Sequence, residues 1–464
     1  MKEQTHIHFI AIGGAVMHNL AIDMHSRGFF VSGSDDEIFE PARSRLAAFG
    51  LLPASEGWHP EKISRELDAV ILGMHARMDN PELIRCLELG IKVYSFPEYL
   101  YEQTRDKLRV VVGGSHGKTT ITSMIMHVLK EAGIVFDYLV GAQVQGFDTM
   151  VSVKETSKLA VFEGDEYLSS AIDPRPKFHL YKPHIAVISG IAWDHMNVFP
   201  TIENYTDQFR KFIRLVEEGG SIIYYEGDCL LADLVETSKR KIKKIPYNGH
   251  PSVVRDGTTY LLHGKGKTAI KLFGRHNLLN IDAALHVCRE LGVTDRLFYR
   301  AIGTFTGAAR RLQLLSQSRI TAVYYDFAHA PSKLRATVGA VKEQFPHRGL
   351  TACIELHTFS SLNREFLPQY AGCMDQAEEA VVFFNPETLT HKRLPTLPPD
   401  DLMKAFARDD LRVFNNAEAL REHLLSSGWE NRNLLLMSSG NLGGIDVHEL
   451  AEKITGKVRG RRKR

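Results

Sequence analysis

Short runs of apolar residues, separated by longer amphipathic stretches, dominate the pattern of this chain. In the first hundred residues, apolar runs occupy 6–12, 29–32 and 69–72, and a helical stretch over 17–26 lies between the first two. A short run of apolar residues is typical of a strand buried on both faces, as in a parallel sheet. The alternation of strand and helix therefore predicts an α/β unit built on a parallel sheet.

The same alternation continues through two further blocks. Apolar runs of the second block occupy 108–112, 159–162, 185–189 and 221–225, and a helix is expected to begin near Asn277. Those of the third block occupy 320–325, 351–354, 380–384 and 433–437. A polar stretch precedes the second block, and 464 residues exceed what one hydrophobic core usually serves. We predict three α/β domains, at 1–107, 108–315 and 316–464.

Composition narrows the classes of partner. With 57 basic and 55 acidic residues, the formal net charge of +2 provides no general field for nucleic acid or for an anionic membrane. The segment 457–464 is strongly basic, but a solvated tail is the simpler interpretation. Five scattered cysteines argue against a disulfide framework or a zinc site. No apolar window is long enough to span a bilayer, so we expect a cytoplasmic protein without stable membrane association and without nucleic acid.

A glycine-rich turn between a strand and a helix is the strongest chemical signal. The strand ending at Val112 runs into this turn, and a helical stretch follows. Glycines let backbone N–H groups face a triphosphate at a helix N-terminus, a lysine adds positive charge, and a threonine hydroxyl can bind Mg²⁺. Val112 replaces the first glycine of the usual motif, although strand, turn and helix keep their order. The predicted nucleotide-binding residues are Gly114, Ser115, His116, Gly117, Lys118, Thr119 and Thr120.

Two other apolar strands deliver polar residues to the same end of this sheet. Glu163 opens an acidic cluster that ends at Glu166, and His195 follows the strand at 185–189. Open α/β sheets bind ligands at this end, and a carboxylate there can hold a metal ion that bridges phosphates. Taken singly, a helix cap for the acidic cluster and a packed surface position for His195 remain open alternatives.

Three later motifs complete a resemblance to a known family. They are Gly274-Arg-His-Asn277-Leu-Leu-Asn280, Arg310-Arg311-Leu312 and Tyr325-Asp326-Phe-Ala-His329-Ala-Pro331. With the glycine turn, they resemble the Mur ligase family in order and spacing over essentially the whole chain. The resemblance implies a Rossmann-like UDP-binding domain, a central P-loop ATPase domain and a C-terminal Rossmann-like α/β domain. It also implies that ATP converts a carboxylate into an acyl phosphate, which an amine attacks to form an amide.

The N-terminal turn resembles the UDP-binding turn of the family members that use UDP-N-acetylmuramate. Ala11 and Val16 replace two of its usual glycines. The same two residues break the G-x-G-x-x-G pattern that a dinucleotide-dependent dehydrogenase would have. Hydride transfer also has no need of a phosphate-binding Lys-Thr-Thr, so both observations argue against a dehydrogenase. The residues that the resemblance assigns to the UDP-sugar are Gly13, Gly14, Ser34, Asp35, His75 and Asn80.

For the ATP site, the resemblance implies a division of labour among domains. Lys118, Glu163 and His195 are the implied catalytic residues, and Thr119, Glu163 and His195 the implied ligands of Mg²⁺ or Mn²⁺. Asn277 would lie near the adenine, while Arg311 and Asp326 would reach the nucleotide from other domains. Many relatives carry a carbamylated lysine where this chain has Phe209, so we predict no carbamate.

Two stretches after the glycine-rich turn bear on which amine the family resemblance implies. Two branches of the family use UDP-N-acetylmuramate: one adds L-alanine, and the other adds the peptide L-Ala-γ-D-Glu-meso-diaminopimelate during cell-wall recycling. The stretches 163–167 and 173–178 resemble the peptide-adding branch. The implied amino-substrate contacts are Arg175, Lys177, His357 and Asn363. A non-catalytic, nucleotide-gated protein that senses UDP-sugars is the alternative from another functional class.

Overall fold

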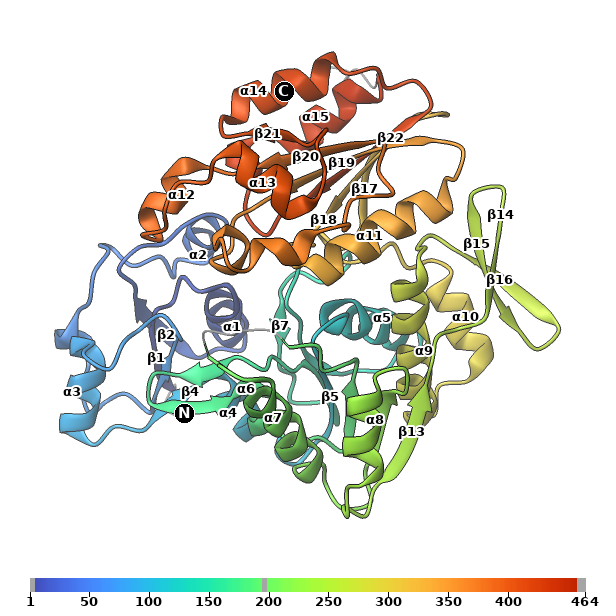
Figure 1. Ribbon diagram of the computed structural model, residues 1–464. Helices are drawn as coiled ribbons and strands as arrows, with labels where there is room; N and C mark the ends of the chain where they lie inside the picture. Colours follow the sequence, from blue (N-terminus) through green and yellow to red (C-terminus); the bar gives the residue numbers. More distant parts are fainter. Residues whose placement is uncertain (1–4, 194–197, 457–464) are drawn as a thin grey trace, which may run out of the picture. The chain divides into compact units, whose positions relative to one another are not determined.

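Parallel β-sheets flanked by helices make up the molecule (Figure 1). The computed structural model describes residues 5–193 and 198–456. Two compact units divide the chain, Met1–Gly249 with Leu279–Ile302 and His250–Leu278 with Gly303–Arg464. The α/β class with parallel sheets, predicted from the sequence, is confirmed. Within the described residues, no helix is long and apolar enough to cross a membrane.

The first sheet has four parallel strands in the order β2-β1-β3-β4. Its strands are β1 (His6–Ile10), β2 (Phe30–Ser34), β3 (Ala69–Leu72) and β4 (Val93–Ser95). The helices that follow them are α1 (Ala15–Ser26), α2 (Ala42–Ala48) with the short η1 (Pro60–Lys62), α3 (Pro81–Leu89) and α4 (Phe96–Thr104). Ile7 of β1 pairs with Val31 on one side and Ala69 on the other, which makes β1 a central strand.

The second sheet has seven strands in the order β13-β12-β11-β5-β8-β6-β7, and only the last pairing, β6 with β7, is antiparallel. The strands are β5 (Leu108–Gly113), β6 (Asp137–Leu139), β7 (Val151–Ser152), β8 (Leu159–Glu163), β11 (Ile185–Ile188), β12 (Ser221–Tyr225) and β13 (Lys243–Tyr247). Strands β8 and β11 flank β5, so the carboxyl ends of these three strands lie side by side. The predicted nucleotide turn and acidic cluster therefore meet at one edge.

Helices and one hairpin complete this sheet. The helices are α5 (Lys118–Glu131), α6 (Lys177–Leu180), α7 (Ile202–Arg214), α8 (Cys229–Glu236), α9 (Arg275–Glu290) and α10 (Asp295–Ile302). The hairpin consists of β9 (Leu168–Ser170) and β10 (Asp173–Pro176), which pair antiparallel. Helix α7 is amphipathic, because Tyr205, Phe209 and Phe212 are buried while Arg210 and Arg214 are exposed. That pattern fixes which face of α7 meets solvent.

The second unit contains a six-stranded sheet in the order β17-β18-β22-β19-β20-β21, with β17 antiparallel to its neighbour. Its strands are β17 (Gln313–Gln317), β18 (Ala322–Asp326), β19 (Gly349–Glu355), β20 (Glu379–Phe383), β21 (Arg412–Phe414) and β22 (Arg432–Met437). Its helices are α11 (Pro331–Gln344), η2 (Ser360–Leu362), η3 (Leu367–Tyr370), α12 (Pro386–His391), α13 (Pro399–Phe406), α14 (Ala417–Ser426), η4 (Leu442–Gly444) and α15 (Val447–Ile454).

A small antiparallel sheet was not predicted from the sequence. It consists of β14 (Ser252–Arg255), β15 (Thr258–His263) and β16 (Gly266–Ile270). Most of its residues are exposed or half-buried, and only Thr259, Leu261 and Ile270 are buried. Without a buried face on each strand, the segment shows no run of apolar residues for sequence analysis to detect.

Burial explains the unbroken apolar runs of the large sheets. Consecutive residues of a strand point to opposite faces. Tyr324 and Tyr325 of β18 accordingly belong to two different clusters of buried side chains, one on each face of the sheet. Phe9 of the first sheet and Val111 of the second belong to one shared cluster. The predicted boundary at 107 thus lies inside one compact unit; the three-domain division remains a prediction.

Candidate functional site

The turn between β5 and α5 has a backbone shape that favours glycine. We call residues 113–120 the phosphate loop. Gly114 and Gly117 have φ angles of 120° and 77°. A Cβ at Gly114 would lie 2.5 Å from Ser189 Oγ, and one at Gly117 would lie 2.2 Å from Asn280 Oδ1. A larger residue at either position would therefore be both strained and clashing. The loop is closely packed at a helix N-terminus, the arrangement that binds phosphate.

Lys118 is held inside this loop by two oxygen atoms. Its Nζ donates to Gly114 O at 2.8 Å and forms an ion pair with Glu166 Oε2 at 2.6 Å. The Glu166 side chain is 1% exposed and that of Lys118 is 15% exposed. Burial alone would lower the pKa of the Lys118 ammonium, but Glu166 and Asp165 outweigh burial and raise this pKa. Lys118 therefore stays charged, as neutralisation of a phosphate requires.

Thr119 and Glu163 place two oxygen atoms next to each other. Thr119 Oγ1 donates to Glu163 Oε1 at 2.8 Å, and Glu163 Oε2 accepts the Gly141 N–H at 2.6 Å. Carboxylate and hydroxyl oxygens are suitable ligands for Mg²⁺. In the described part of the chain, no three His, Cys, Asp or Glu residues cluster as a metal site. His195 lies outside the described residues, so its role as a ligand remains a prediction.

Two residues of this site were not predicted from the sequence. Glu166, the partner of Lys118, was expected only as part of the acidic cluster. Asn280 belongs to one of the later motifs but had no predicted contact, and its carboxamide lies against Gly117. Both residues are buried polar groups. The available signal was the place of each residue in a polar motif at the end of a predicted strand or the start of a predicted helix.

Phe209 takes part in an aromatic cluster beside this site. Its ring lies 5.4 Å from that of Phe178 and 5.2 Å from that of Tyr205, measured between centroids. Phe178 in turn lies against Gly113, where a Cβ would approach its ring to 3.2 Å. Position 209 is therefore filled by apolar packing, and the lack of a carbamate remains a prediction.

The first sheet brings four predicted UDP-sugar residues together. Gly13 N–H donates to Asp35 Oδ2 at 2.7 Å, and Gly14 begins α1 as its N-cap. Ser34, at the end of β2, is fully buried. Burial raises the pKa of Asp35 to about 6, although the Gly13 hydrogen bond opposes the rise. Ala11 has a φ of 66°, a conformation that glycine adopts more easily.

The other two predicted UDP-sugar residues follow β3 at the same edge. His75 is exposed. Asn80 is buried and caps α3, since its Oδ1 accepts the N–H groups of Glu82 and Leu83 at 3.0 and 3.1 Å. Capping is a sufficient structural reason for an asparagine at this position. Contacts of either residue with a ligand remain predictions.

Three predicted nucleotide contacts belong to the second unit, whereas the phosphate loop belongs to the first. Asn277 is buried and its Nδ2 donates to Phe273 O at 2.9 Å. The Arg311 guanidinium lies 4.7 Å from the centroid of the Phe327 ring. Asp326 accepts the N–H groups of Leu312 at 2.5 Å and Ala328 at 2.7 Å. Their joint approach to one nucleotide remains a prediction.

Asp326 also orders the segment that carries Arg311. Arg310 and Leu312, on either side of Arg311, both have left-handed backbones, with φ of 55° and 46°. Such conformations cost free energy in non-glycine residues and tend to occur at functional sites. The hydrogen bond from Leu312 to Asp326 holds this strained turn, so two residues predicted separately from the sequence are structurally linked.

His357 lies near a buried carboxylate that was not predicted, that of Glu355. Glu355 Oε2 accepts hydrogen bonds from Leu442 N, at 2.9 Å, and from the Ser438 hydroxyl. A Cβ at Gly440 would lie 2.9 Å from the His357 ring, so this ring lines the same turn. Asn363 Oδ1 accepts the Glu365 N–H at 2.9 Å. Contacts of His357 and Asn363 with an amino substrate remain predictions.

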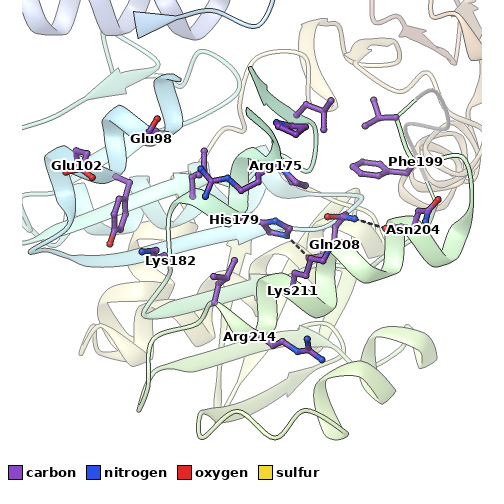
Figure 2. Close-up of a pocket in the computed structure, with 17 residues that line it drawn as sticks. Glu98, Glu102, Arg175, His179, Lys182, Phe199, Asn204, Gln208, Lys211 and Arg214 are labelled. Carbon is purple, nitrogen blue, oxygen red and sulfur yellow. Dashed lines mark hydrogen bonds between the residues drawn. The ribbon is translucent and has the colours of Figure 1, made fainter. Parts of the chain in front are cut away.

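Arg175 and Lys177 point to different surroundings. Lys177 forms an ion pair with Asp165 at 2.6 Å, inside the acidic cluster. Arg175 pairs with Asp173 at 2.7 Å and lines a hollow beside α7 (Figure 2). The two cations predicted to meet one peptide are thus separated by the turn from β10 into α6.

Two family models match this chain. The family model described as Mur ligase family, catalytic domain, matches residues 6–107. The model described as Mur ligase middle domain matches residues 112–288. The two matches cover the first sheet and the phosphate loop with its acidic cluster.

Individual relatives carry two different names. The UDP-N-acetylmuramate–L-alanine ligase of Paenarthrobacter aurescens strain TC1 is 33% identical over 393 residues, 81% of this chain and 82% of that protein. The UDP-N-acetylmuramate–L-alanyl-γ-D-glutamyl-meso-2,6-diaminoheptandioate ligase of Escherichia coli K12 is 30% identical, over 72% of this chain and 75% of that protein. A crystal structure of UDP-N-acetylmuramate–alanine ligase from Thermotoga maritima shares the fold at a TM-score of 0.72 and 20% identity, covering 98% and 99% of the two chains.

Proposed function

This chain belongs to the Mur ligase family, and on that premise we propose that it is an ADP-forming ligase that makes an amide bond. The arrangement of Lys118, Thr119 and Glu163 at the phosphate loop carries the proposal. It combines a charged ammonium, a hydroxyl and a carboxylate at a helix N-terminus. A triphosphate with a bound divalent cation requires these groups. ATP is the proposed nucleotide.

The proposed reaction requires the site to hold two anions close together, the substrate carboxylate and the triphosphate of ATP. The substrate carboxylate attacks the γ-phosphorus of ATP, the bond to the bridging oxygen breaks, and ADP leaves. The amine then attacks the acyl carbon of the acyl phosphate and phosphate departs, which leaves the amide. The loop amides and Lys118 lower the repulsion between carboxylate and triphosphate and hold them in line. Thr119 and Glu163, with His195, would hold Mg²⁺ or Mn²⁺, which supplies further charge neutralisation.

UDP-N-acetylmuramate is the proposed carboxylate donor. The support is the turn after β1, where Gly13, Gly14 and Asp35 form a glycine turn at a helix N-terminus. Such a turn is suited to a diphosphate. Both relatives described above carry UDP-N-acetylmuramate in their names. Because ATP and a nucleotide sugar are intracellular substrates, we propose a cytoplasmic location.

The peptide L-Ala-γ-D-Glu-meso-diaminopimelate is the proposed amine, which places the enzyme in peptidoglycan recycling. The support is the stretch from Glu163 to Phe178, which resembles the peptide-adding branch and supplies two cations, Arg175 and Lys177. A peptide with several carboxylates needs cationic partners that free alanine does not. L-Alanine is the second candidate, because the Paenarthrobacter relative is named for it.

Phosphate release from ATP tests these proposals. The full chain would be assayed with UDP-N-acetylmuramate and either L-alanine or the tripeptide. We expect release that needs the donor and the tripeptide together. A preference for L-alanine would move the chain to the biosynthetic branch. If no phosphate is released with either amine, the proposed ligase reaction with this donor is contradicted.

A further inference from the structure

A hollow of about 920 Å³ lies in the first unit, beside α7. Its walls come from α4, the strand β10, α6 and α7 (Figure 2). No residue of the phosphate loop lines it. The hollow is therefore a separate candidate for ligand binding, and none of the roles described above occupies it apart from the predicted contact of Arg175.

Charges of both signs line this hollow. Glu98 and Glu102 come from α4, on one side of the view in Figure 2, and Arg175 and Lys182 lie next to them. Lys211 comes from α7, on the other side. Aromatic and aliphatic side chains lie among the charged ones, including Tyr101, Phe199 and Leu215. The lining therefore offers partners to both a cation and an anion that are joined by an apolar segment.

Lys182 is held at this surface by a buried arginine. Arg109, which is 2% exposed, donates from Nε to Tyr181 O at 2.8 Å and to Lys182 O at 3.1 Å. The Lys182 backbone is left-handed, with a φ of 41°. Its ammonium lies 4.8 Å from the centroid of the Tyr101 ring and has no carboxylate partner among the described residues. Backbone strain in a residue other than glycine is frequent at ligand sites, and the free charge of Lys182 is available to an anionic group.

Arg214 of α7 also lines the hollow, and two further lining cations, Arg175 and Lys211, are oriented by carboxylates that do not line it. Arg175 pairs with Asp173 at 2.7 Å. Lys211 pairs with Asp207 at 2.9 Å, and the same Asp207 pairs with Arg210 at 2.9 Å. Asp173, Asp207 and Arg210 are absent from the lining. Arg210 and Lys211 are therefore a matched pair, since they share a partner and a helix and differ in whether they face the hollow.

One wall of the hollow also contacts the ATP site. Phe199 packs against Tyr205, with ring centroids 5.6 Å apart. The Tyr205 hydroxyl donates to Glu166 Oε1 at 3.3 Å, and Glu166 is the ion-pair partner of Lys118. A ligand that presses on Phe199 is thus two contacts away from the residue that holds Lys118.

We propose that this hollow binds a zwitterionic amino acid or short peptide. The ligand's carboxylate meets Arg175, Lys182 and Lys211, and its ammonium meets Glu98 and Glu102. A simple anion would leave the two glutamates facing it, and a simple cation would face the lysines and the arginine, so only a ligand with both charges satisfies the whole lining. Two sources share this chemistry, a free amino acid and the far end of the peptide substrate; the second source rests on the proposed function.

Isothermal titration of the full chain without ATP or donor tests the site independently of the ligase reaction. The probes are meso-diaminopimelate, pimelate, which lacks its amines, and cadaverine, which lacks its carboxylates. We expect meso-diaminopimelate to bind at least tenfold more tightly than either. Lys211→Gln and Glu98→Gln should each weaken binding at least tenfold, and Arg210→Gln should leave it unchanged. Glutamine at position 98 keeps the side-chain length that suits the third residue of a capped helix such as α4.

Several outcomes would overturn the proposal. Equal binding of pimelate would make the hollow an anion site, and equal effects of Lys211→Gln and Arg210→Gln would place the ligand elsewhere. If meso-diaminopimelate does not bind at millimolar concentration, the hollow is not a binding site for such a ligand. Given binding, phosphate-release kinetics separate the sources. If meso-diaminopimelate competes with the tripeptide, the hollow binds the far end of the peptide. If it changes the KM for ATP without such competition, the hollow binds a free amino acid that acts on the ATP site.

Discussion

The ammonium of Lys118 lies 2.6 Å from the carboxylate of Glu166. The lysine opens α5, and the glutamate belongs to the acidic cluster that follows β8. The pair has two consequences for a site that binds a triphosphate. It compensates a buried ammonium before nucleotide arrives, and it fixes the position from which Lys118 meets the phosphates.

Glu166→Gln should destabilise the protein without nucleotide. Removing one partner of a buried ion pair leaves a buried charge, which costs roughly 3 kcal/mol and lowers the melting temperature by roughly 5 °C or more. ATP should restore much of the loss, because its phosphates supply the missing negative charge. Thermal unfolding with and without ATP measures both effects. Asp165→Asn is the control, since Asp165 is 38% exposed and its loss should cost less than about 1 kcal/mol; equal shifts for the two variants would contradict the prediction.

Gly117→Ala should weaken ATP binding through a steric clash with Asn280. The added Cβ would lie 2.2 Å from Asn280 Oδ1, so the loop must shift. We expect the KM for ATP to rise at least tenfold. Gly133→Ala is a matched control, because Gly133 has a similar φ of 70° but no atom within 4 Å of the added Cβ. That variant should lose about 1 kcal/mol of stability from backbone strain and keep its KM. An unchanged KM in Gly117→Ala would show that the loop does not bind ATP.

Thr119→Val should abolish most activity while the protein stays folded. Valine keeps the shape but removes the hydroxyl that lies 2.8 Å from Glu163. A loss of roughly a hundredfold in kcat is expected for a metal-binding hydroxyl that acts in the transition state. Thr119→Ser should retain activity. Thr122→Val, in the same helix, removes a buried hydroxyl without a hydrogen-bond partner in the described structure, so it should be neutral or slightly stabilising. If Thr119→Val keeps wild-type kcat, the proposed role fails.

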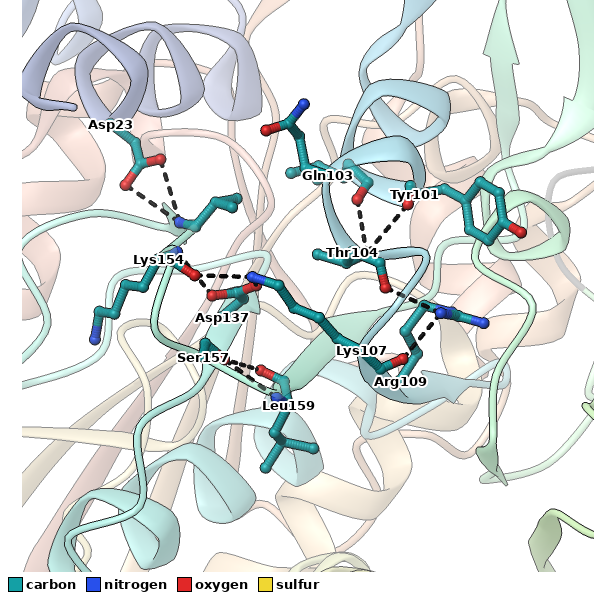
Figure 3. A network of polar contacts seen from close by, with 12 residues as sticks. Asp23, Tyr101, Gln103, Thr104, Lys107, Arg109, Asp137, Lys154, Ser157 and Leu159 are labelled. Atoms are coloured by element: carbon teal, nitrogen blue, oxygen red, sulfur yellow. Dashed lines mark hydrogen bonds and ion pairs between the residues drawn. The ribbon is translucent and has the colours of Figure 1, made fainter. Parts of the chain in front are cut away.

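Asp23 belongs to a polar network at the link between the first two sheets (Figure 3). Its carboxylate accepts the Val153 N–H at 3.2 Å. Next to it, Lys107 donates to Asp137 at 2.7 Å and to Lys154 O at 2.8 Å. These contacts join α1, the link and the strands of the second sheet, and together with the shared core they make this region one compact unit.

Asp23→Asn should stabilise the protein above pH 6. Burial raises the pKa of Asp23 to about 6, although the Val153 hydrogen bond and Arg27 lower it. Since this pKa is about 4 in an unfolded chain, the folded state binds more protons between pH 4 and 6. Stability therefore falls as pH rises through this window, by about 2–3 kcal/mol, and the penalty remains above it. Asparagine removes the penalty and can still accept the hydrogen bond.

Denaturation of this variant across pH 2 to 8 checks the sign. The gain should be absent near pH 4 and full near pH 7. Asp173→Asn provides the opposite case: burial would raise the pKa of Asp173, but its hydrogen bonds with Arg175 outweigh burial and lower this pKa. That variant should lose stability at neutral pH, and the loss should shrink as pH falls below 4. Parallel curves for the two variants would contradict both assignments.

The sequence by itself determined the central buried strands of the large sheets, their parallel pairing and the phosphate loop. Strands β5, β8 and β11 were visible because both faces are buried, which forces unbroken apolar runs. The loop was visible because positive φ values at Gly114 and Gly117 demand glycine at fixed spacing. Both signals are local, since each depends on the burial or backbone shape of the residue that carries it.

Tertiary structure alone decided which side chains meet. It gave Lys118 its partner Glu166, placed Asn280 against Gly117, and turned Arg175 and Lys177 to different surroundings. The exposed antiparallel sheet of β14, β15 and β16 was also seen only in the structure, because its sequence contains no apolar run. Such contacts depend on strand order and on the path of distant connections, and local hydrophobic periodicity carries no information about either.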